Sequence, residues 1–184
     1  MANLIVISGD LAAGKSTLAA SLSEELNLVH LTKDSLKEIA CDAIGYTTRE
    51  ENRQLSIAAT DSMIYFFNQC ALVGKSLILE ANFRQDEMMK IKEIADNYNY
   101  QVLLIVLTGD INLLYQRFLD RMVNRHIAHR SLNLDYSIER FANYINEIRN
   151  QDLIYPPYTI DMSDLDEEEV TEKALSIIHQ ELGI

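Results

Sequence analysis

The sequence predicts an α/β fold in which helices cover both faces of a parallel β-sheet. Short apolar runs without polar interruptions, such as LIVIS at 4–8 and YQVLLIVLT at 100–108, are typical of strands buried on both faces. Longer segments between these runs repeat apolar residues every three or four positions, as one face of an α-helix does. This alternation of strands and helices is typical of a parallel sheet with crossover helices.

The strands are predicted from these apolar runs and from the loop residues that bound them. The first run leads directly into a glycine-containing loop, and the third, SLILEANF, ends in polar residues. The last run, YTIDMS, follows two prolines that interrupt the preceding helical pattern. The predicted strands are 4–8, 26–32, 76–83, 100–108 and 158–163.

The helices are predicted where one apolar face continues between residues that start or stop a helix. In the first helix, Leu18, Leu22 and Leu26 recur every four positions. Asp34 or Ser35 is expected to cap the second, because both residue types are favoured at helix starts. The predicted helices are 16–27, 35–44, 49–73, 85–98, 109–130, 137–151 and 164–182.

Length and charge limit what kind of protein this is. The 184 residues fit one domain, and no linker divides the range 1–184. The net charge of −12 would repel duplex DNA, so nucleic acid is not an expected partner. No apolar run approaches the roughly 20 residues of a membrane span, and no signal peptide is recognisable. We therefore expect a cytoplasmic monomer or homodimer.

The segment GDLAAGKST at 9–17 carries the strongest functional signal. It fits the pattern G-x-x-x-x-G-K-[ST] and lies between a predicted buried strand and a predicted helix. Glycines let backbone N–H groups turn toward an anion, and the helix start adds a positive dipole end. The lysine can reach β- and γ-phosphates, and the serine hydroxyl can ligate Mg²⁺. The residues expected to hold the nucleotide are Gly9, Ala12, Ala13, Gly14, Lys15, Ser16 and Thr17.

Other motifs narrow the class of nucleotide-binding protein. The third strand lacks the D-x-x-G and the fourth the N-K-x-D that GTPases need, and the chain is short for a transporter ATPase. The chain resembles the P-loop kinases that phosphorylate hydroxyl groups, the group containing polynucleotide kinase, chloramphenicol phosphotransferase and zeta-toxin-like enzymes. The resemblance extends from Leu4 to about Asp135 and rests on four segments. These are GDLAAGKST, KDSLK, LILEANFR and RFLDRMVNRHIAHR.

This resemblance implies a three-layer P-loop NTPase fold with strand order 2-3-1-4-5 and a helical lid at about 117–135. It also implies ATP and Mg²⁺ as cofactors. Asp34, after the second strand, would orient the acceptor hydroxyl and accept its proton, whereas the alternative reading is a helix cap. Lys37, like Asp34, is expected to contact the substrate; it stands where related kinases have an arginine, and a lysine cannot form the same two-point clamp.

The third strand supplies three further candidates. Glu80 is expected to hold a Mg²⁺-bound water or to shape the substrate site, and the alternative is a solvent-exposed acid at a strand end. Asn82 and Arg84 are expected to contact substrate. Arg84 could equally be a surface residue at the start of the next helix.

The predicted lid is basic in an otherwise acidic chain. Arg117, Arg121 and Arg125 are spaced by four and would line one side of a helix. We expect Arg121 and Arg125 to neutralise charge on the transferred phosphoryl group, and Arg121 also to bind the nucleotide. The alternative is a solvated basic face. Ile127 and Ala128 replace proline and glycine of the related lids, which predicts a more helical, less hinged lid.

The predicted activity is transfer of the γ-phosphoryl group of ATP to a hydroxyl of a small molecule. One alternative is a kinase for a polynucleotide 5′-hydroxyl or a nucleotide sugar. The other is a regulatory module that binds a nucleotide without a transfer substrate. The acceptor itself cannot be read from the sequence.

Overall fold

A computed structural model of the chain describes residues 1–130 and 137–184. Its centre is one five-stranded sheet in the order β2-β3-β1-β4-β5, and every neighbouring pair is parallel. The predicted fold class and strand order are therefore confirmed. The strands are β1 (Asn3–Gly9), β2 (Val29–Thr32), β3 (Leu77–Glu80), β4 (Gln101–Thr108) and β5 (Pro157–Asp161).

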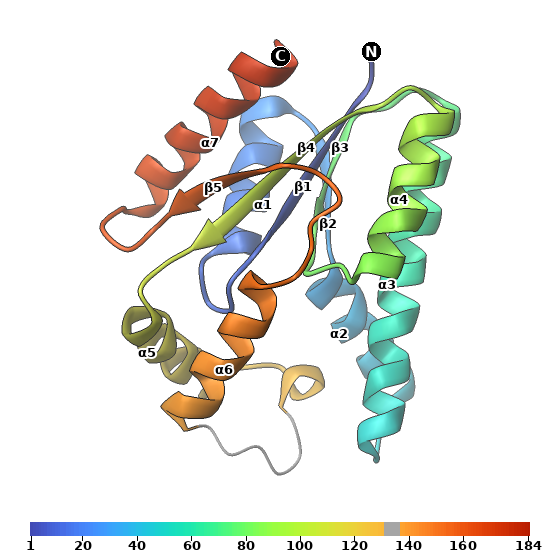
Figure 1. Ribbon diagram of the computed structural model, residues 1–184. Coiled ribbons are helices and arrows are strands. Elements are labelled where there is room, and N and C mark those ends of the chain that lie inside the picture. The colour runs from blue at the N-terminus through green and yellow to red at the C-terminus, as the bar shows by residue number, and fades with distance from the viewer. Residues whose placement is uncertain (131–136) are drawn as a thin grey trace.

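Helices cover the sheet on both faces and extend beyond the ends of its strands (Figure 1). α1 and α7 pack on one face and α3 and α4 on the other, whereas α2, α5 and α6 lie beyond the C-terminal ends of the strands (Figure 1). The helices are α1 (Lys15–Leu26), α2 (Lys33–Ile44), α3 (Arg49–Leu72), α4 (Gln85–Asn97), α5 (Ile111–Met122), α6 (Ile138–Arg149) and α7 (Glu167–Leu182).

The core consists of two apolar layers separated by the sheet. Along β1, Ile5 and Ile7 face the α1 and α7 side, and Leu4 and Val6 face the α3 and α4 side. All four side chains are fully buried. Burial on both faces explains why this strand is apolar throughout rather than alternating with polar residues.

Several predicted element boundaries are wrong, and two of them bear on the site. The third strand ends at Glu80 and not at 83, although the Ala81 N–H still donates to the Ile7 carbonyl at 3.1 Å. Helix α2 begins at Lys33 and is capped by Thr32, whose hydroxyl accepts the Ser35 N–H at 3.4 Å. Asp34 therefore does not cap the helix, and its carboxylate is available for other contacts.

The predicted continuous helix at 109–130 is also wrong. α5 begins after the cap Asp110 and ends at Met122, and a short 3₁₀ turn, Ile127–His129, follows. Side-chain donors replace the helical backbone bonds of this segment, one from α2's C-terminal loop and one from the segment itself. The Tyr46 hydroxyl donates to the carbonyl of Ile127, and the Arg130 guanidinium donates to the Arg125 carbonyl at 2.7 Å. The lid is thus less helical than its sequence suggests, and the predicted lid residues 131–135 lie outside the described residues.

The active end of the fold lies away from both chain termini (Figure 1). The loops after β1, β2 and β3 meet where the parallel strands end, as is usual for ligand sites in open α/β sheets. No helix within residues 1–130 and 137–184 has the length and apolar character needed to span a membrane.

Candidate active site

The P-loop (Gly9–Thr17) joins β1 to α1 in a conformation that its glycines permit. Gly9 has φ 124°, and a Cβ placed there would lie 2.0 Å from the Leu107 carbonyl oxygen of β4. Gly14 has φ 87° and precedes α1 without a side-chain cap on the helix start. The first amides of α1 therefore point toward the loop without a side chain in the way, which is the arrangement that binds phosphate.

Lys15 lies over this loop. Its ammonium group donates to the carbonyl oxygens of Gly9 at 3.0 Å and Asp10 at 2.6 Å. Burial lowers the pKa of Lys15, and the negative charges of Glu80, Asp34 and Asp10 oppose that shift. The lysine is thus anchored to backbone carbonyls at the place where the motif predicts phosphate oxygens.

Glu80 ends β3 directly beside the P-loop helix. The Ser16 hydroxyl donates to Glu80 Oε2 at 3.0 Å, and Glu80 is only 6% exposed. Burial raises the pKa of Glu80, while the nearby Lys15 charge lowers it. The alternative of a solvent-exposed strand-end acid is therefore wrong. A serine hydroxyl next to a buried carboxylate is a donor set suited to Mg²⁺.

Asp34, in the first turn of α2, faces the lid. Its carboxylate accepts a hydrogen bond from Arg125 at 2.5 Å, and His129 Nδ1 lies 3.7 Å from its other oxygen. Burial alone would raise the pKa of Asp34, but the charges of His129 and Arg125 outweigh burial and lower it. Asp34 is accordingly an ionised carboxylate, and its charge also acts on Lys15.

The lid turn (residues 125–130) is tied to α2 and α3 by further side chains. His129 Nε2 lies 2.9 Å from Glu38, and His126 Nε2 lies 3.0 Å from Asp42, both on α2. From α3, the Asn52 amide donates to the Ala128 carbonyl at 3.1 Å. These contacts bring the lid turn down over Asp34.

A cavity of about 450 Å³ lies between the P-loop, α2, α3, the lid and α6. We call it the Asp34 cavity, because Asp34 lies on its wall together with the P-loop residues Leu11 and Ala12. Burial lowers the pKa of Arg121, which also lines this cavity, although its guanidinium keeps the high basicity of arginine. The further lining residues are Lys37, Arg49, Asn52, Phe118, Met122, Arg125, Ala128, His129, Ser137, Arg140, Phe141 and Tyr144.

Several predicted site residues are thus brought together, but two are not. Asn82 Oδ1 accepts from the Ser8 hydroxyl and from the Gly9 N–H, each at 3.1 Å, and so supports the start of the P-loop. Arg84 pairs with Asp86 and Glu87. Both line a separate cavity of about 380 Å³ on the α4 side, so their predicted contact with substrate stays a prediction.

Arg117 lies apart from Arg121 and Arg125. One of its guanidinium nitrogens is 3.6 Å from the Met162 sulfur, and it lines a small cavity of about 50 Å³ between α1, α5 and the loop after β5. The predicted stripe of three arginines on one helix is wrong, because α5 ends before Arg125. The break allows Arg125 to reach Asp34, while Arg117 faces the start of the P-loop helix α1.

The sequence did not reveal an ion pair that fixes the second residue of the P-loop. The Asp10 side chain is 2% exposed and pairs with Arg149 at 2.6 Å. The same guanidinium donates to the Gly109 carbonyl at 2.6 Å, and the Thr108 hydroxyl donates to Asp10 at 2.9 Å. Since 139 residues separate the two partners, only the observation that an acid immediately follows Gly9 hinted at such a contact.

Solved structures resemble this chain over nearly its full length. A candidate kinase from Chloroflexus aurantiacus J-10-fl is 26% identical with a TM-score of 0.80, covering 95% of this chain and 97% of that one. A gluconokinase from Sinorhizobium meliloti 1021 is 14% identical with a TM-score of 0.63, covering 97% and 92%. The APS kinase CysC of Mycobacterium tuberculosis is 11% identical with a TM-score of 0.62, covering 97% and 98%. The last two likenesses concern the fold alone.

The family comparison agrees with the geometry of the site. No curated protein matches the chain. The family model described as Zeta toxin matches residues 2–168, which include the P-loop, Asp34, Glu80 and the lid turn. Together with the kinase-like P-loop fold, this match shows that the chain belongs to the Zeta toxin family.

Proposed function

We propose that the protein is a kinase that transfers the γ-phosphoryl group of ATP to a hydroxyl group of a small molecule. One observation carries the proposal: an ionised carboxylate, Asp34, lines the same cavity as the P-loop residues Leu11 and Ala12. A protein that only binds a nucleotide has no need of a carboxylate there, because it would repel the phosphates. A kinase needs one to orient the acceptor.

The nucleotide phosphates bind to the P-loop amides and to Lys15. To do so, the Lys15 ammonium exchanges its bonds to the Gly9 and Asp10 carbonyls for bonds to phosphate oxygens. Ser16 and Glu80 would hold Mg²⁺, which supplies charge neutralisation for the phosphate oxygens when bound. Arg117 and Met162 lie beside the start of α1 around a recess of about 50 Å³, so the nucleotide base would pack over this recess rather than inside it.

Transfer then requires the acceptor hydroxyl between Asp34 and the γ-phosphorus. The acceptor oxygen forms a bond to phosphorus, and the bond to the β–γ bridging oxygen breaks, so that ADP leaves with the electron pair. Asp34 orients the hydroxyl and takes its proton late in this step. Arg121 and Arg125 line the same cavity and can stabilise the negative charge of the transferring group.

Replacing Asp34 with asparagine tests the proposal. Asp34→Asn keeps the size and removes the charge and the basic oxygen, so we expect nucleotide affinity within about two-fold of wild type and a loss of transfer of about 10²–10⁴-fold. Nucleotide affinity is measured by titration with Mg·ATP, and transfer by ADP release in a screen of hydroxylated metabolites, antibiotics, nucleosides and oligonucleotides.

Asp42→Asn is the matched control, because Asp42 also lies on α2 and contacts the lid through His126. Asp42 is not part of the Asp34 cavity, so its variant is expected to retain transfer. Equal activity of Asp34→Asn and wild type would exclude the proposed role. A preference for oligonucleotides in the same screen would instead favour the polynucleotide alternative.

A further inference from the structure

We propose that the acceptor is an acidic compound, carrying a phosphate or carboxylate group away from its reacting hydroxyl, and that Arg49 and Arg140 bind this group. The inference rests on the proposed kinase function. It starts from the charges of the Asp34 cavity. Among the described residues that line it, five are cationic, Lys37, Arg49, Arg121, Arg125 and Arg140, and one, Asp34, is a carboxylate.

Two of these cations act on groups near the transferring phosphoryl group, one through a hydrogen bond and the other through its charge. Arg125 bonds to Asp34 at 2.5 Å. Arg121 is placed electrostatically with the P-loop, since its charge acts on the pKa values of both Lys15 and Glu80. Both arginines are therefore assigned to the phosphoryl group and its surroundings.

The side chains of the other three cations make no such contact. Across residues 1–130 and 137–184, the side chains of Lys37, Arg49 and Arg140 take part in no ion pair and no hydrogen bond, and Arg140 donates only its backbone N–H, to the Ser137 hydroxyl. Arg49 is the first residue of α3, and Arg140 lies in the first turn of α6. Neither helix contributes to the P-loop, so these two arginines stand on walls of the cavity that the nucleotide phosphates do not need.

Arg49 and Arg140 line the cavity and are exposed to solvent, so they are accessible to a ligand, and an anion bound between two cations is attracted by both. Burial already lowers the pKa of Lys37, with the charge of Asp34 opposing that shift. Arginine offers planar, two-point donor geometry that fits carboxylate and phosphate groups. The overall charge of −12 makes this local excess of positive charge more distinctive, since the rest of the surface would repel an acidic compound.

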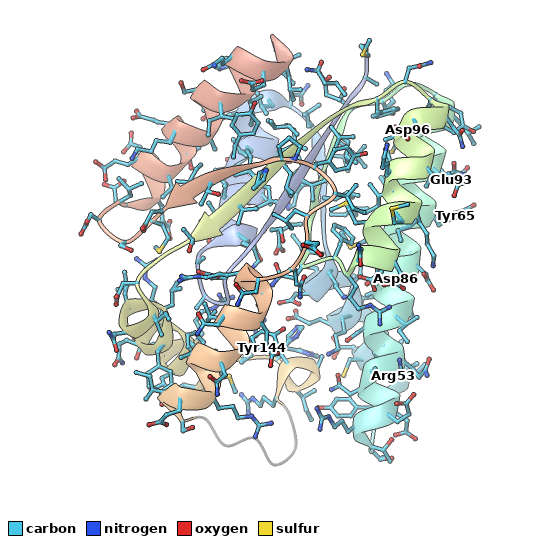
Figure 2. The ribbon with its side chains drawn as sticks, in the orientation of Figure 1. Arg53, Tyr65, Asp86, Glu93, Asp96 and Tyr144 are labelled. Atoms are coloured by element: carbon cyan, nitrogen blue, oxygen red, sulfur yellow. The ribbon has the colours of Figure 1, made fainter. Side chains whose placement is uncertain are left out.

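The cavity also has an apolar side that suits the body of such a compound. Phe118, Phe141 and Tyr144 line it, and Tyr144 projects from α6 (Figure 2). An acceptor with a hydroxyl at Asp34 and an acidic group at Arg49 and Arg140 would span this wall. At about 450 Å³, the cavity has room for a small metabolite of this kind.

The test uses acceptors in matched pairs and a double variant. Each neutral alcohol is offered beside its carboxylate and its phosphate ester, for example glucose beside gluconate and glucose 1-phosphate. We expect wild type to prefer an acidic member by about 10-fold or more in kcat/KM, as a charged hydrogen bond of this strength implies. In Arg49→Gln/Arg140→Gln, KM for that acceptor should rise by about 10-fold or more, with kcat and KM for ATP unchanged. The carboxylate and phosphate arms show which acidic group the site prefers.

Arg53→Gln is the control, because Arg53 lies four residues after Arg49 on α3, is 55% exposed at its side chain and pairs with Glu50. Figure 2 labels Arg53 on this helix. It should leave acceptor KM unchanged. Equal use of neutral and acidic members, or an acidic preference that survives the double substitution, would overturn the inference while leaving the kinase function intact.

A binding measurement covers the case in which no compound is phosphorylated. That result contradicts the proposed function, and the acidic site is then judged separately. With the P-loop filled by Mg·AMPPNP, pyrophosphate is titrated into wild type and the double variant. Binding that is about 10-fold weaker in the variant supports the site at Arg49 and Arg140, and equal or absent binding rejects it.

Discussion

The P-loop and the lid turn face each other across the Asp34 cavity, but they are fixed by different kinds of contact. The contacts that hold the P-loop include a buried carboxylate: Asn82 bonds to Gly9, and Asp10, which is 2% exposed at its side chain, pairs with Arg149 at the end of α6. The lid turn is held by partly exposed ion pairs, such as Arg125 with Asp34 at side-chain exposures of 24% and 45%. Buried contacts of this type are costly to break, whereas exposed pairs contribute at most about 1 kcal/mol each.

This difference suits the two tasks. A phosphate-binding loop has to keep its amides in place before the nucleotide arrives, so that binding does not order a flexible segment. A lid over an acceptor has to rearrange in each reaction cycle. The weak contacts of the lid turn therefore allow it to move during turnover, and the strong contacts of the P-loop keep its amides in place.

The largest effect is expected when the P-loop backbone itself is disturbed. Gly9→Ala adds a Cβ that would lie 2.0 Å from the Leu107 carbonyl oxygen, at φ 124°, so we expect a loss of about 4 kcal/mol or more in unfolding free energy. Gly14→Ala at φ 87° meets no atom within 4 Å and should cost about 1–2 kcal/mol. Urea unfolding of both variants measures the difference between their losses of unfolding free energy. Similar losses in the two would show that β4 does not confine the loop.

A smaller effect is expected when the ion pairs on the two sides are broken. Arg149→Met leaves the Asp10 carboxylate buried without its cation, which should cost about 3 kcal/mol. Arg125→Met breaks the pair with Asp34, where water can replace the arginine, and should cost less than about 1 kcal/mol. Thermal unfolding under identical conditions compares the two. If Arg125→Met proves the more destabilising variant, the lid is not the weaker side.

The smallest expected effect is the change of unfolding free energy with pH. It has opposite signs for Glu80, beside the P-loop, and for Asp34, beside the lid turn. Burial raises the pKa of Glu80 above 4.5, so the stability from its protonated form is complete below pH 4.5 and is lost as pH rises through the raised pKa. Asp34 has a pKa below 3.8 through the charges of His129 and Arg125, which outweigh burial, so its stability is present above pH 3.8 and is lost as pH falls.

The unfolding free energy of Glu80→Gln should therefore increase relative to wild type as pH rises from 4.5 toward neutral. Asp34→Asn should be less stable than wild type above pH 3.8, and this difference should disappear as pH falls below 3.8. Metal-free urea unfolding at a series of pH values measures both differences. A Glu80→Gln difference that does not vary with pH would contradict the burial of an ionisable Glu80.

The fold and the P-loop could be predicted from the sequence because their signals are local. An uninterrupted apolar run marks a strand covered on both faces, and the glycine and lysine spacing of residues 9–17 follows directly from the geometry of a phosphate site. The burial of Glu80 was open from sequence alone, because an acid after SLILE looks the same whether it is buried or exposed.

The contacts that sequence analysis missed join distant segments. The Asp10–Arg149 pair spans 139 residues and leaves no local pattern. The end of α5 at Met122 also depends on distant residues, because Tyr46 and Asn52 bind the carbonyl groups of Ile127 and Ala128. Local helical propensity favoured a longer helix there, and tertiary contacts override such propensity.

The hydrogen bond between Arg125 and Asp34 has a consequence for substrate traffic. Each oxygen of a carboxylate can accept two hydrogen bonds, so the one that Arg125 holds at 2.5 Å can still receive an incoming alcohol. The alcohol therefore does not have to displace the arginine. It meets a carboxylate whose orientation has been set beforehand, which spares the entropy of aligning the base for each recipient.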